Sequence, residues 1–347
     1  MDATTIAVDL AKHVFELATT DRSGRVLERR RLNRAQFARF LIGHPPTHVV
    51  MEACATAHHW GRVAQDAGHR VSLLPPQYVR PFVRRQKTDR TDVAGLLDAQ
   101  RSDHLHPVPV KTVGQQEVLA LHRVRQQWIA TRTARINALH GLLGEYGVCV
   151  RPTVRRIGPV VGAVLADAEA LLPGRLRRAL QALLEEIAAL TARITGLDHE
   201  LKDLAADDAT MTRLQTIPGV GVLTATAMVG AVAHIHAFRR ARRFASWLGV
   251  TPREHSSGNR RRLGGITKQG DTYLRTLLTQ GARAVLFGAR RAVLGGRALP
   301  ALQAWAVSLA ERRGVHRAVM ALANRLARIV WAVWSRDVAF APRTQAA

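Results

Sequence analysis

The sequence predicts an α/β region at the N-terminus, then a helical coiled-coil insert and a mostly α-helical C-terminal region. Three observations lead to this prediction. Short runs rich in β-formers fill the first hundred positions, a heptad pattern of Leu and Ile occupies the middle, and glycine-punctuated helical patterns follow. Hydrophobic residues make up 47% of the 347 positions, which is enough for a packed core and excludes a largely disordered chain.

The first hundred residues contain five candidate strands. Three of them, TTIAVDL, HVFELATTD and RVLERRRLN, follow one another closely, as in an antiparallel meander. A helix is expected from Arg34 to Leu41, then the apolar strand THVVMEA, a helix from His58 to Ala67, and the strand RVSLLP, which two prolines close. Three strands followed by helix, strand, helix and strand is the order expected of an RNase H-like sheet.

The middle of the chain, from about 112 to 210, predicts long helices. Leu or Ile fills all eight positions of a pattern that repeats every seven residues, which is typical of a coiled-coil seam. A seam requires a partner helix but does not say which chain supplies it. The helix over 118–143 of the same chain and a helix of a second copy of the chain are therefore equal alternatives. The eight positions are Leu180, Leu183, Ile187, Leu190, Ile194, Leu197, Leu201 and Leu204.

Charge is unevenly distributed along the chain. The 51 Lys and Arg residues against 26 Asp and Glu give a net charge of +25. Residues 105–212 hold 13 basic and 11 acidic residues, whereas residues 213–297 hold 15 basic residues against Glu254 and Asp271 alone. Clustered cations gain affinity for phosphates by releasing counterions. The segment 213–297 is therefore predicted to face a nucleic acid.

Other features of the sequence indicate the compartment. No run of eighteen apolar residues is present, so no membrane span is expected. The N-terminus carries an acidic residue where a secretory signal would be basic. Two cysteines, Cys54 and Cys149, are too few for a disulfide framework. We expect a protein of the reducing cytoplasm.

Four carboxylates form the first candidate site. Asp9 ends the first predicted strand, Glu52 ends the fourth, and Asp89 and Asp92 stand three apart at the start of a helix, on one face. In an RNase H-like sheet the first and fourth strands are neighbours and the later helix packs across them, so the four acids should converge. Carboxylates that hold one or two Mg²⁺ ions can neutralise the charge that develops in phosphodiester cleavage.

Alternatives to this metal site exist. Each acid taken singly also fits a turn or a helix cap, although an ionised Glu52 next to the apolar VVM requires a partner or a metal. Sugar kinases and actin-like ATPases open with a similar strand pattern, but the glycine-rich phosphate loops that they need are absent from the first hundred residues. We therefore expect no nucleotide cofactor.

The segment TPREHSSGNRRRLGGITKQGDTYLR forms the second candidate site. Ser256 and Ser257 precede Gly258 in a loop surrounded by cations, where a serine could attack a phosphodiester while the cations stabilise the developing charge. The same loop could instead only grip phosphates. Tyr273 is another possible nucleophile, or a residue that packs on its helix. The predicted nucleic-acid contacts here are Arg253, Ser256, Arg260, Arg261, Arg262 and Lys268.

The segment LQTIPGVG resembles a helix-hairpin-helix. In such a hairpin, backbone N–H groups at a helix start bind a DNA phosphate without reading sequence, which makes Gly219 and Gly221 candidate contacts. A plain turn between two packed helices is the alternative.

Five segments taken together resemble the DEDD transposases of the insertion sequence 110 family, with Piv-type site-specific invertases as relatives. The resemblance covers roughly 4–102 and 210–287, and AHHW and PPQYVRPF are most similar to the eleven-eleven subgroup. The family often has Asn before the third acid and Ala between the later two, where this chain has KTDRTDV. The five segments are IAVDLAKHVFELA, VVMEACATAHHWGR, LLPPQYVRPFVRRQKTDRTDVAGLL, IPGVGVLTATAMVG and FASWLGVTPREHSSGNRRRLGGITKQGDTYLRTLL.

The resemblance implies a four-part organisation. A RuvC-like catalytic domain would span 1–104, and a helical coiled-coil dimerisation region would span 105–209. A serine-bearing transposase domain would then cover 210–290. Residues 291–347 lie outside the resemblance and are expected, from their composition, to form a basic helical extension.

The resemblance also implies roles for the site residues. Asp9, Glu52, Asp89 and Asp92 would bind Mg²⁺, and Ser257 would form a phosphoserine link to DNA, with Ser256 as the second choice. Dimers would assemble into a tetramer in which the acids of one subunit act with the serine of another. A structured bridge RNA would pair with donor and target DNA.

The expected function is therefore bridge-RNA-guided excision and insertion of the chain's own insertion sequence, in the bacterial cytoplasm and at the nucleoid when bound to DNA. Two alternatives stay open. One is a RuvC-like structure-specific nuclease with water as the nucleophile, and the other is a non-catalytic nucleic-acid-binding protein.

Overall fold

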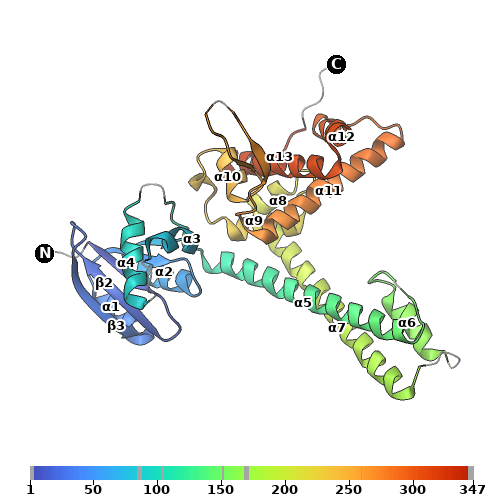
Figure 1. Ribbon diagram of the computed structural model, residues 1–347, viewed down its shortest axis with the longest axis horizontal. Coiled ribbons are helices and arrows are strands. Elements are labelled where there is room, and N and C mark those ends of the chain that lie inside the picture. Colours follow the sequence, from blue (N-terminus) through green and yellow to red (C-terminus); the bar gives the residue numbers. More distant parts are fainter. Residues whose placement is uncertain are drawn as a thin grey trace. The chain divides into compact units, whose positions relative to one another are not determined.

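The protein divides into two compact units, Met1–Gln115 and Gln116–Ala347 (Figure 1). The computed structural model describes residues 4–83, 88–102, 105–150, 152–167, 172–258 and 260–342, and the side chain of Asp89 lies outside this set. Each unit is described by itself. The four-part division expected from the sequence is finer than this and stays a prediction.

A five-stranded mixed sheet forms the centre of the N-terminal unit. Its strand order is β3-β2-β1-β4-β5, where the first three strands of the chain pair antiparallel and β4 runs parallel to both β1 and β5. This is the strand order predicted from the sequence. The strands are β1 (Thr5–Asp9), β2 (Val14–Thr20), β3 (Val26–Asn33), β4 (His48–Glu52) and β5 (Arg70–Leu74).

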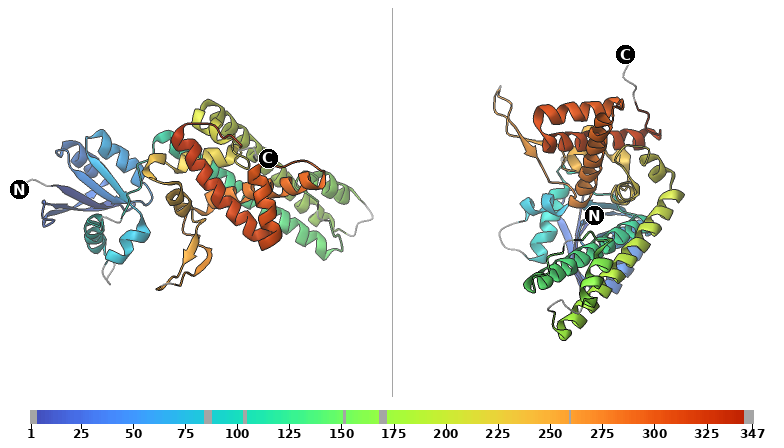
Figure 2. Two further views of the ribbon diagram at one scale, coloured as in Figure 1. Left: turned by 90° about the horizontal axis from the view of Figure 1, so that it is seen from above. Right: turned by 90° about the vertical axis from the view of Figure 1, so that its right-hand side faces the viewer.

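Helices cover both faces of this sheet (Figure 2). On one face, Phe37 and Trp60 both pack edge-on against Phe15, with ring centroids 5.1 and 5.2 Å from it. On the opposite face Val93 packs in a smaller core with Ala7 of β1. The helices are α1 (Arg34–Gly43) and α2 (Ala57–Asp66) on the first face, and α3 (Pro76–Val79), the 3₁₀ turn η1 (Arg80–Phe82) and α4 (Asp89–Gln100) with the second core.

Local sequence signals set two of these helix starts. Asn33 accepts a hydrogen bond from the Gln36 N–H while the Gln36 side chain accepts one from Asn33, which is a capping box at the start of α1. Thr88 and Thr91 exchange the same pair of hydrogen bonds at the start of α4. Both caps satisfy N–H groups that a helix start leaves without partners.

The C-terminal unit begins with a long helical hairpin. Helix α5 (Val113–Glu145) begins at the end of the N-terminal unit and continues into an antiparallel pairing with α7 (Gly174–Asp207). Arg125 pairs with Asp198 at 2.6 Å, and Arg135 pairs with Glu186 at 2.8 Å. Residue numbers rise along α5 as they fall along α7, so the two helices run in opposite directions.

The heptad seam of α7 is covered within this single chain. Six of its eight positions are buried and the other two, Leu183 and Leu204, are half-buried. Helix α6 (Ile157–Ala166) packs near the closed end of the hairpin, where Leu139 and Ile187 share a core with it. The structure therefore gives the seam a partner helix within the same chain.

The largest core of the C-terminal unit lies among helices α8 to α13. It contains Leu214, Phe244 and Leu278, and it continues through Leu322 and Val330 near the C-terminus. The predicted extension beyond residue 290 thus packs into the same core as the helices before it. These elements are α8 (Ala209–Leu214), α9 (Val222–Ala231), η2 (Ile235–Ala237), α10 (Ala241–Trp247), β6 (Pro252–Glu254), β7 (Leu263–Ile266), α11 (Thr272–Leu294), α12 (Ala301–Arg313) and α13 (Val315–Arg336).

Among the described residues, none of the helices combines the length and the hydropathy that crossing a lipid bilayer requires.

A buried polar network ties the helical hairpin to the C-terminal core. The imidazole of His122 on α5 contacts the Tyr273 hydroxyl of α11 at 2.8 Å and the Thr226 hydroxyl of α9 at 2.9 Å. Arg125, which pairs with Asp198, also hydrogen-bonds to Tyr273. Burial, together with the nearby Arg125 cation, lowers the pKa of His122 to about 4. The ring is therefore neutral at neutral pH, with both nitrogens engaged.

Two glycines allow a close backbone contact between the turn before α9 and helix α11. A Cβ on Gly281 would lie 1.9 Å from the carbonyl oxygen of Gly219, and a Cβ on Gly219 would lie 2.7 Å from that of Gly281. Gly219 also has φ +83°, a conformation that side-chain-bearing residues rarely adopt. The contact anchors the middle of α11.

We predict that Gly281→Ala destabilises the protein by about 1–3 kcal/mol, because the added methyl group overlaps the Gly219 backbone. Gly288→Ala is the matched control, since it lies on the same helix with open space around its Cβ position. That control should change stability by no more than about 1 kcal/mol, and in the favourable direction. Urea denaturation of both variants measures the difference. Equal stabilities would contradict the packing argument.

We also predict that the C-terminal unit loses stability as the pH falls from about 6.5 toward 4. The folded pKa of His122 is about 4, below the ordinary value of 6.5, so in this window the unfolded chain binds the proton more tightly. The stabilisation is complete above pH 6.5 and is lost as His122 is protonated. His122→Gln should flatten this part of the curve in denaturant titrations at several pH values. An unchanged pH dependence in the variant would refute the assignment.

Candidate functional site

Asp9 and Glu52 end two neighbouring parallel strands. Val8 pairs with Met51 in the β1–β4 register, so the next residue on each strand is one of these acids. Alternate residues of a strand face opposite sides of a sheet. Val8 and Met51 belong to the core under α1 and α2, whereas Ala7 belongs to the core under α4. Asp9 and Glu52 therefore point to the α4 side, as half-buried side chains next to each other.

The direction of α4 brings Asp92 to the same end of the sheet. Gln100, at the C-terminal end of α4, hydrogen-bonds to His48 at the start of β4 with a distance of 3.2 Å. Helix α4 thus runs antiparallel to β4, and its first turn lies beside Glu52 at the strand's end. Eight residues of helix and four residues of strand both span roughly 12–13 Å, so Asp92 and Glu52 lie at matching heights. The side chain of Asp89, the fourth predicted acid, lies outside the described residues.

A fourth described carboxylate, Glu16, was missed in the sequence reasoning. It is the direct partner of Asp9 in the antiparallel β1–β2 register, so its side chain faces the same side of the sheet. Side chains of the strand HVFELATT alternate between the two faces of the sheet. Pairing this strand with the first strand at Asp9 would have identified Glu16 from the sequence.

The local chemistry of this sheet end is that of a negatively charged site. Burial raises the pKa of the Cys54 thiol, and the nearby carboxylates of Glu52 and Asp9 raise it further. Carboxylate oxygens are the donors that Mg²⁺ prefers. Among the side chains that the structure describes, no three acidic, His or Cys groups form a complete metal site. The donors fit a divalent cation that Asp9 and Glu52 would hold together with a ligand from α4.

The second predicted site lies on an exposed β-hairpin of the C-terminal unit. Strands β6 and β7 pair antiparallel, and beyond them Ser257 and Arg260 exchange backbone hydrogen bonds of 3.3 and 3.1 Å across the turn. Gly258 within the turn has φ +54°, which suits glycine. Ser257 is therefore placed at the tip of the hairpin, and its side chain is exposed.

The two serines differ in their hydroxyl contacts. Ser256 Oγ donates to the Glu254 carboxylate at 2.8 Å and accepts from the Arg262 N–H at 3.3 Å. Hydrogen bonds from Ser256 and Arg261 lower the pKa of Glu254, so this carboxylate is ionised and engaged. The Ser257 hydroxyl has no hydrogen-bond partner within the described part of the chain. Both serines are exposed, and of the two Ser257 has the hydroxyl that no described residue engages.

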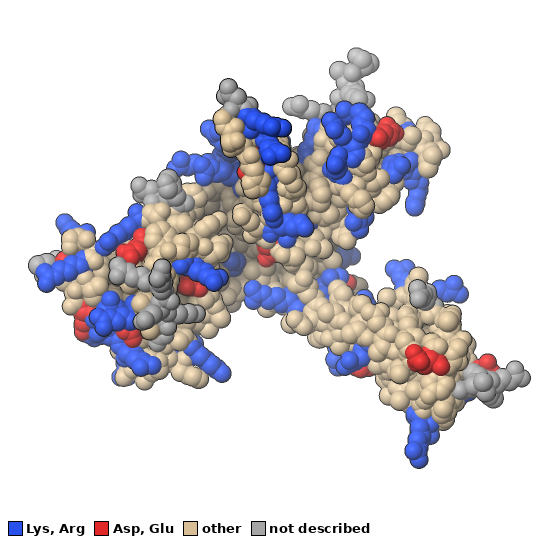
Figure 3. All heavy atoms as spheres, viewed as in Figure 1, with Lys and Arg blue, Asp and Glu red and all other residues tan. Residues whose placement is uncertain are grey.

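The five predicted cations all lie on or beside this hairpin, and all are exposed. Figure 3 shows Lys and Arg side chains along the hairpin with few acidic neighbours. Arg253 donates to the Thr267 carbonyl at 3.4 Å, and Arg261 pairs with Glu254 at 3.0 Å. Lys268 has φ +58° at the base of the hairpin. The remaining two, Arg260 and Arg262, flank the turn.

Tyr273, the alternative nucleophile, is held inside the polar network described above. It is half-buried in the first turn of α11, and burial raises the pKa of its hydroxyl. Its oxygen is already in contact with His122. The arrangement is that of a packed residue, which was the other interpretation of Tyr273 from the sequence.

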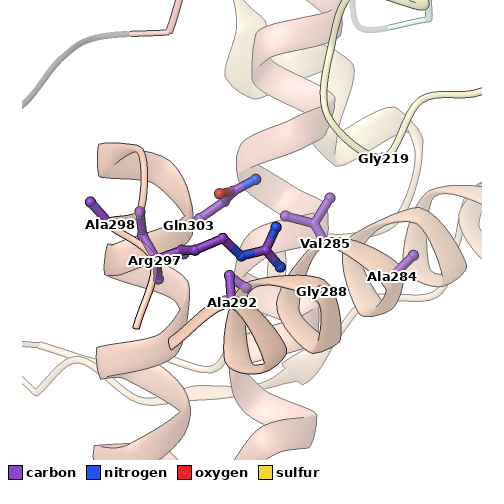
Figure 4. Close-up of a pocket in the computed structure, with 10 residues that line it drawn as sticks. Gly219, Ala284, Val285, Gly288, Ala292, Arg297, Ala298 and Gln303 are labelled. Carbon is purple, nitrogen blue, oxygen red and sulfur yellow. The ribbon is translucent and has the colours of Figure 1, made fainter. Parts of the chain in front are cut away.

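The predicted helix-hairpin-helix glycines lie in a turn between α8 and α9. Val220 N–H bonds to the Ile217 carbonyl, and Gly221 is the N-cap of α9. Gly219 also lines an open cavity of about 500 Å³ between this turn, α11 and the start of α12. Figure 4 shows the Arg297 side chain extending across this cavity, with the Gln303 amide beside it. The close contact with Gly281 gives Gly219 a packing role, and a phosphate contact at Gly219 or Gly221 stays a prediction.

Asp9 and Glu52 thus end adjacent strands of the N-terminal unit, with the first turn of α4, which carries Asp92, at the same end of the sheet, and Ser257 belongs to the C-terminal unit. That the acids and the serine meet around one scissile bond stays a prediction.

Known proteins share both of these regions. A model of the IS110-family DEDD transposases, described as a transposase, matches residues 6–148. A second model, described as the transposase IS116/IS110/IS902 family, matches residues 211–293. The first match contains the acids and the second contains the serine hairpin.

Whole proteins match over nearly the full length. A probable family 20 transposase of Pseudomonas aeruginosa is 39% identical over 99% of this chain and 100% of its own length. The transposase for insertion sequence element IS1111A of Coxiella burnetii is 39% identical over 97% of this chain and 91% of its own. A pilin gene-inverting protein of Moraxella bovis is 24% identical over 83% and 84%. The chain belongs to the IS110 family of transposases.

Proposed function

We propose that this transposase excises and inserts its own insertion sequence through a covalent link between Ser257 and DNA. The observation that carries the proposal is the placement of Asp9 and Glu52 at adjacent strand ends, beside the first turn of α4. Strand cleavage and rejoining must stabilise charge on two oxygens of one phosphate, and a carboxylate cluster that binds divalent cations meets that requirement.

The acids would hold the cation in this proposal. Asp9 and Glu52 would contribute from the strand ends and Asp92 from the first turn of α4, with Asp89, whose side chain lies outside the described residues, as the fourth proposed ligand. One or two Mg²⁺ ions bound there would supply Lewis-acid stabilisation of the scissile phosphate. The adjacent positions of Asp9 and Glu52 at two parallel strand ends support this role, because carboxylate oxygens are the ligands that Mg²⁺ prefers.

Ser257 would supply the nucleophile. Its Oγ forms a bond to phosphorus as the bond to the leaving sugar oxygen breaks; the serine proton is lost and the leaving oxygen gains one. Attack by a sugar hydroxyl of the partner DNA end then reverses the step and frees the serine. The free hydroxyl at the hairpin tip and the cations around it support this assignment. No nucleotide cofactor is required, because the phosphoserine ester conserves the bond energy.

The partners follow from the same proposal. Donor and target DNA, and a structured bridge RNA that pairs with both, would bind the basic surfaces, including Arg253, Arg260 and Arg262. Dimers would assemble into a tetramer in which one subunit's acids act with another's serine. The separation of acids and serine into two units supports such sharing. The α7 seam is buried in its own chain, so other surfaces would carry the assembly. The protein would act in the bacterial cytoplasm, at the nucleoid.

We predict that Ser257→Ala abolishes a protein–DNA adduct that survives denaturation, because the attacking oxygen is removed. Ser256→Ala is the control: it loses only the exposed hydrogen bonds to Glu254 and Arg262, so the adduct should still form. Gel electrophoresis under denaturing conditions with labelled element-end DNA measures the adduct. Persistence of the adduct in Ser257→Ala would assign the covalent link to another residue. DNA cleavage by the wild type without any adduct would favour the nuclease alternative, in which water attacks.

We predict that Asp92→Asn slows DNA cleavage by more than about 100-fold, because a metal ligand contributes several kcal/mol to the transition state. Asp98→Asn, an exposed position on the same helix, should cleave at the wild-type rate. Initial rates at several Mg²⁺ concentrations measure the effect. Equal cleavage rates for the two variants would contradict the role of Asp92 as a metal ligand, and absence of cleavage by the wild type would support a non-catalytic nucleic-acid-binding role.

A further inference from the structure

Three consecutive arginines, Arg29, Arg30 and Arg31, lie on β3, the edge strand of the N-terminal sheet. Neighbouring residues of a strand point to opposite faces. The sheet register decides which of the three arginines points to the side of the sheet that carries the acids. The order of the arginines in the sequence does not reveal this.

The register puts Arg31 in line with the acids. Arg31 pairs with Glu16, and Glu16 pairs with Asp9, whose neighbour on β4 is Glu52. Directly paired residues share a face, so one row of side chains crosses four strands on the α4 side. Strands lie about 4.8 Å apart, which places the Arg31 backbone roughly 10 Å from that of Asp9.

Arg30 and Arg31 differ in what they already contact. Arg30 pairs with Leu17, a residue of the opposite core, and its guanidinium binds Glu28 at 2.6 Å and lies 5.4 Å from the ring of Phe40. Arg31 is exposed, and within the described residues it has neither an ion pair nor a side-chain hydrogen bond. Arg29 faces the α4 side as well but pairs with Ala18, farther from the acids.

The negative electrostatic potential at this end of the sheet is unfavourable for a DNA strand. Asp9, Glu16 and Glu52 repel its phosphates, and a bound cation offsets this only at the scissile position. A guanidinium beyond Glu16 can hold a neighbouring phosphate with two parallel hydrogen bonds. We propose that Arg31 binds a phosphate of the cleaved DNA strand next to the scissile one and so positions that strand over the acids. The inference rests on the proposed role of the acids in DNA cleavage.

Charged side chains also protect an edge strand from pairing with other chains. That role does not depend on which face an arginine occupies, so Arg30→Ala is a matched control for Arg31→Ala. Both are exposed positions on one strand, and neither change should alter the melting temperature.

The test measures binding of the full-length protein to a fluorescent synthetic DNA duplex at several KCl concentrations. It is done with Ca²⁺, which occupies carboxylate sites, and with a chelator. Wild type should bind more tightly with Ca²⁺, and Asp9→Asn should lose this gain. Arg31→Ala should weaken the Ca²⁺-dependent binding roughly five- to tenfold and lower the salt slope by about one, as expected for one lost phosphate contact. Arg31→Lys should keep the slope with intermediate affinity.

The outcomes separate the two proposals. If Arg31→Ala matches Arg30→Ala while Asp9→Asn loses the Ca²⁺-dependent gain, the Arg31 inference is overturned and the metal site stands. If Asp9→Asn keeps the gain, the proposed metal site fails and the Arg31 inference fails with it.

Discussion

The parallel pairing of β1 with β4 is the constraint on which the N-terminal unit depends. Both strands are buried on both faces, so their register is fixed by two different cores at once. A slip of β4 by one residue would turn Met51 into the smaller core and move Glu52 to the face under α2, away from Asp9. The same pairing that stabilises the sheet therefore also sets the distance and direction between Asp9 and Glu52.

Helix α4 completes this site because it is held at both ends. A threonine capping box starts it, and the contact of Gln100 with His48 fixes its far end against β4. Its side away from the sheet packs against η1 so closely that a Cβ on Gly95 would lie 2.8 Å from Val83. The acidic first turn is thus positioned by packing along the whole helix.

The proposed nucleophile in the C-terminal unit lies in a more exposed environment than the acids of the N-terminal unit. Ser257 lies on an exposed hairpin, while the helix that follows is anchored by the Gly219–Gly281 contact and by the Tyr273–His122 pair. A rigid base and an accessible tip suit a group that must reach a large polyanionic substrate. In the proposed mechanism, the acids of one subunit and the serine of another would meet around one phosphate.

Much of this could be predicted from sequence, because strands, strand ends and basic loops leave local patterns. The strand order, Asp9 and Glu52 at strand ends and the serine loop with its cations all come from such patterns and from a family resemblance. The sequence did not decide which partner covers the α7 seam, since apolar heptads accept any helix of matching pattern. It also could not place Glu16 and Arg31 beside Asp9. That neighbourhood exists only through pairing of three strands, and a single shift of register would have sent Arg30 there instead.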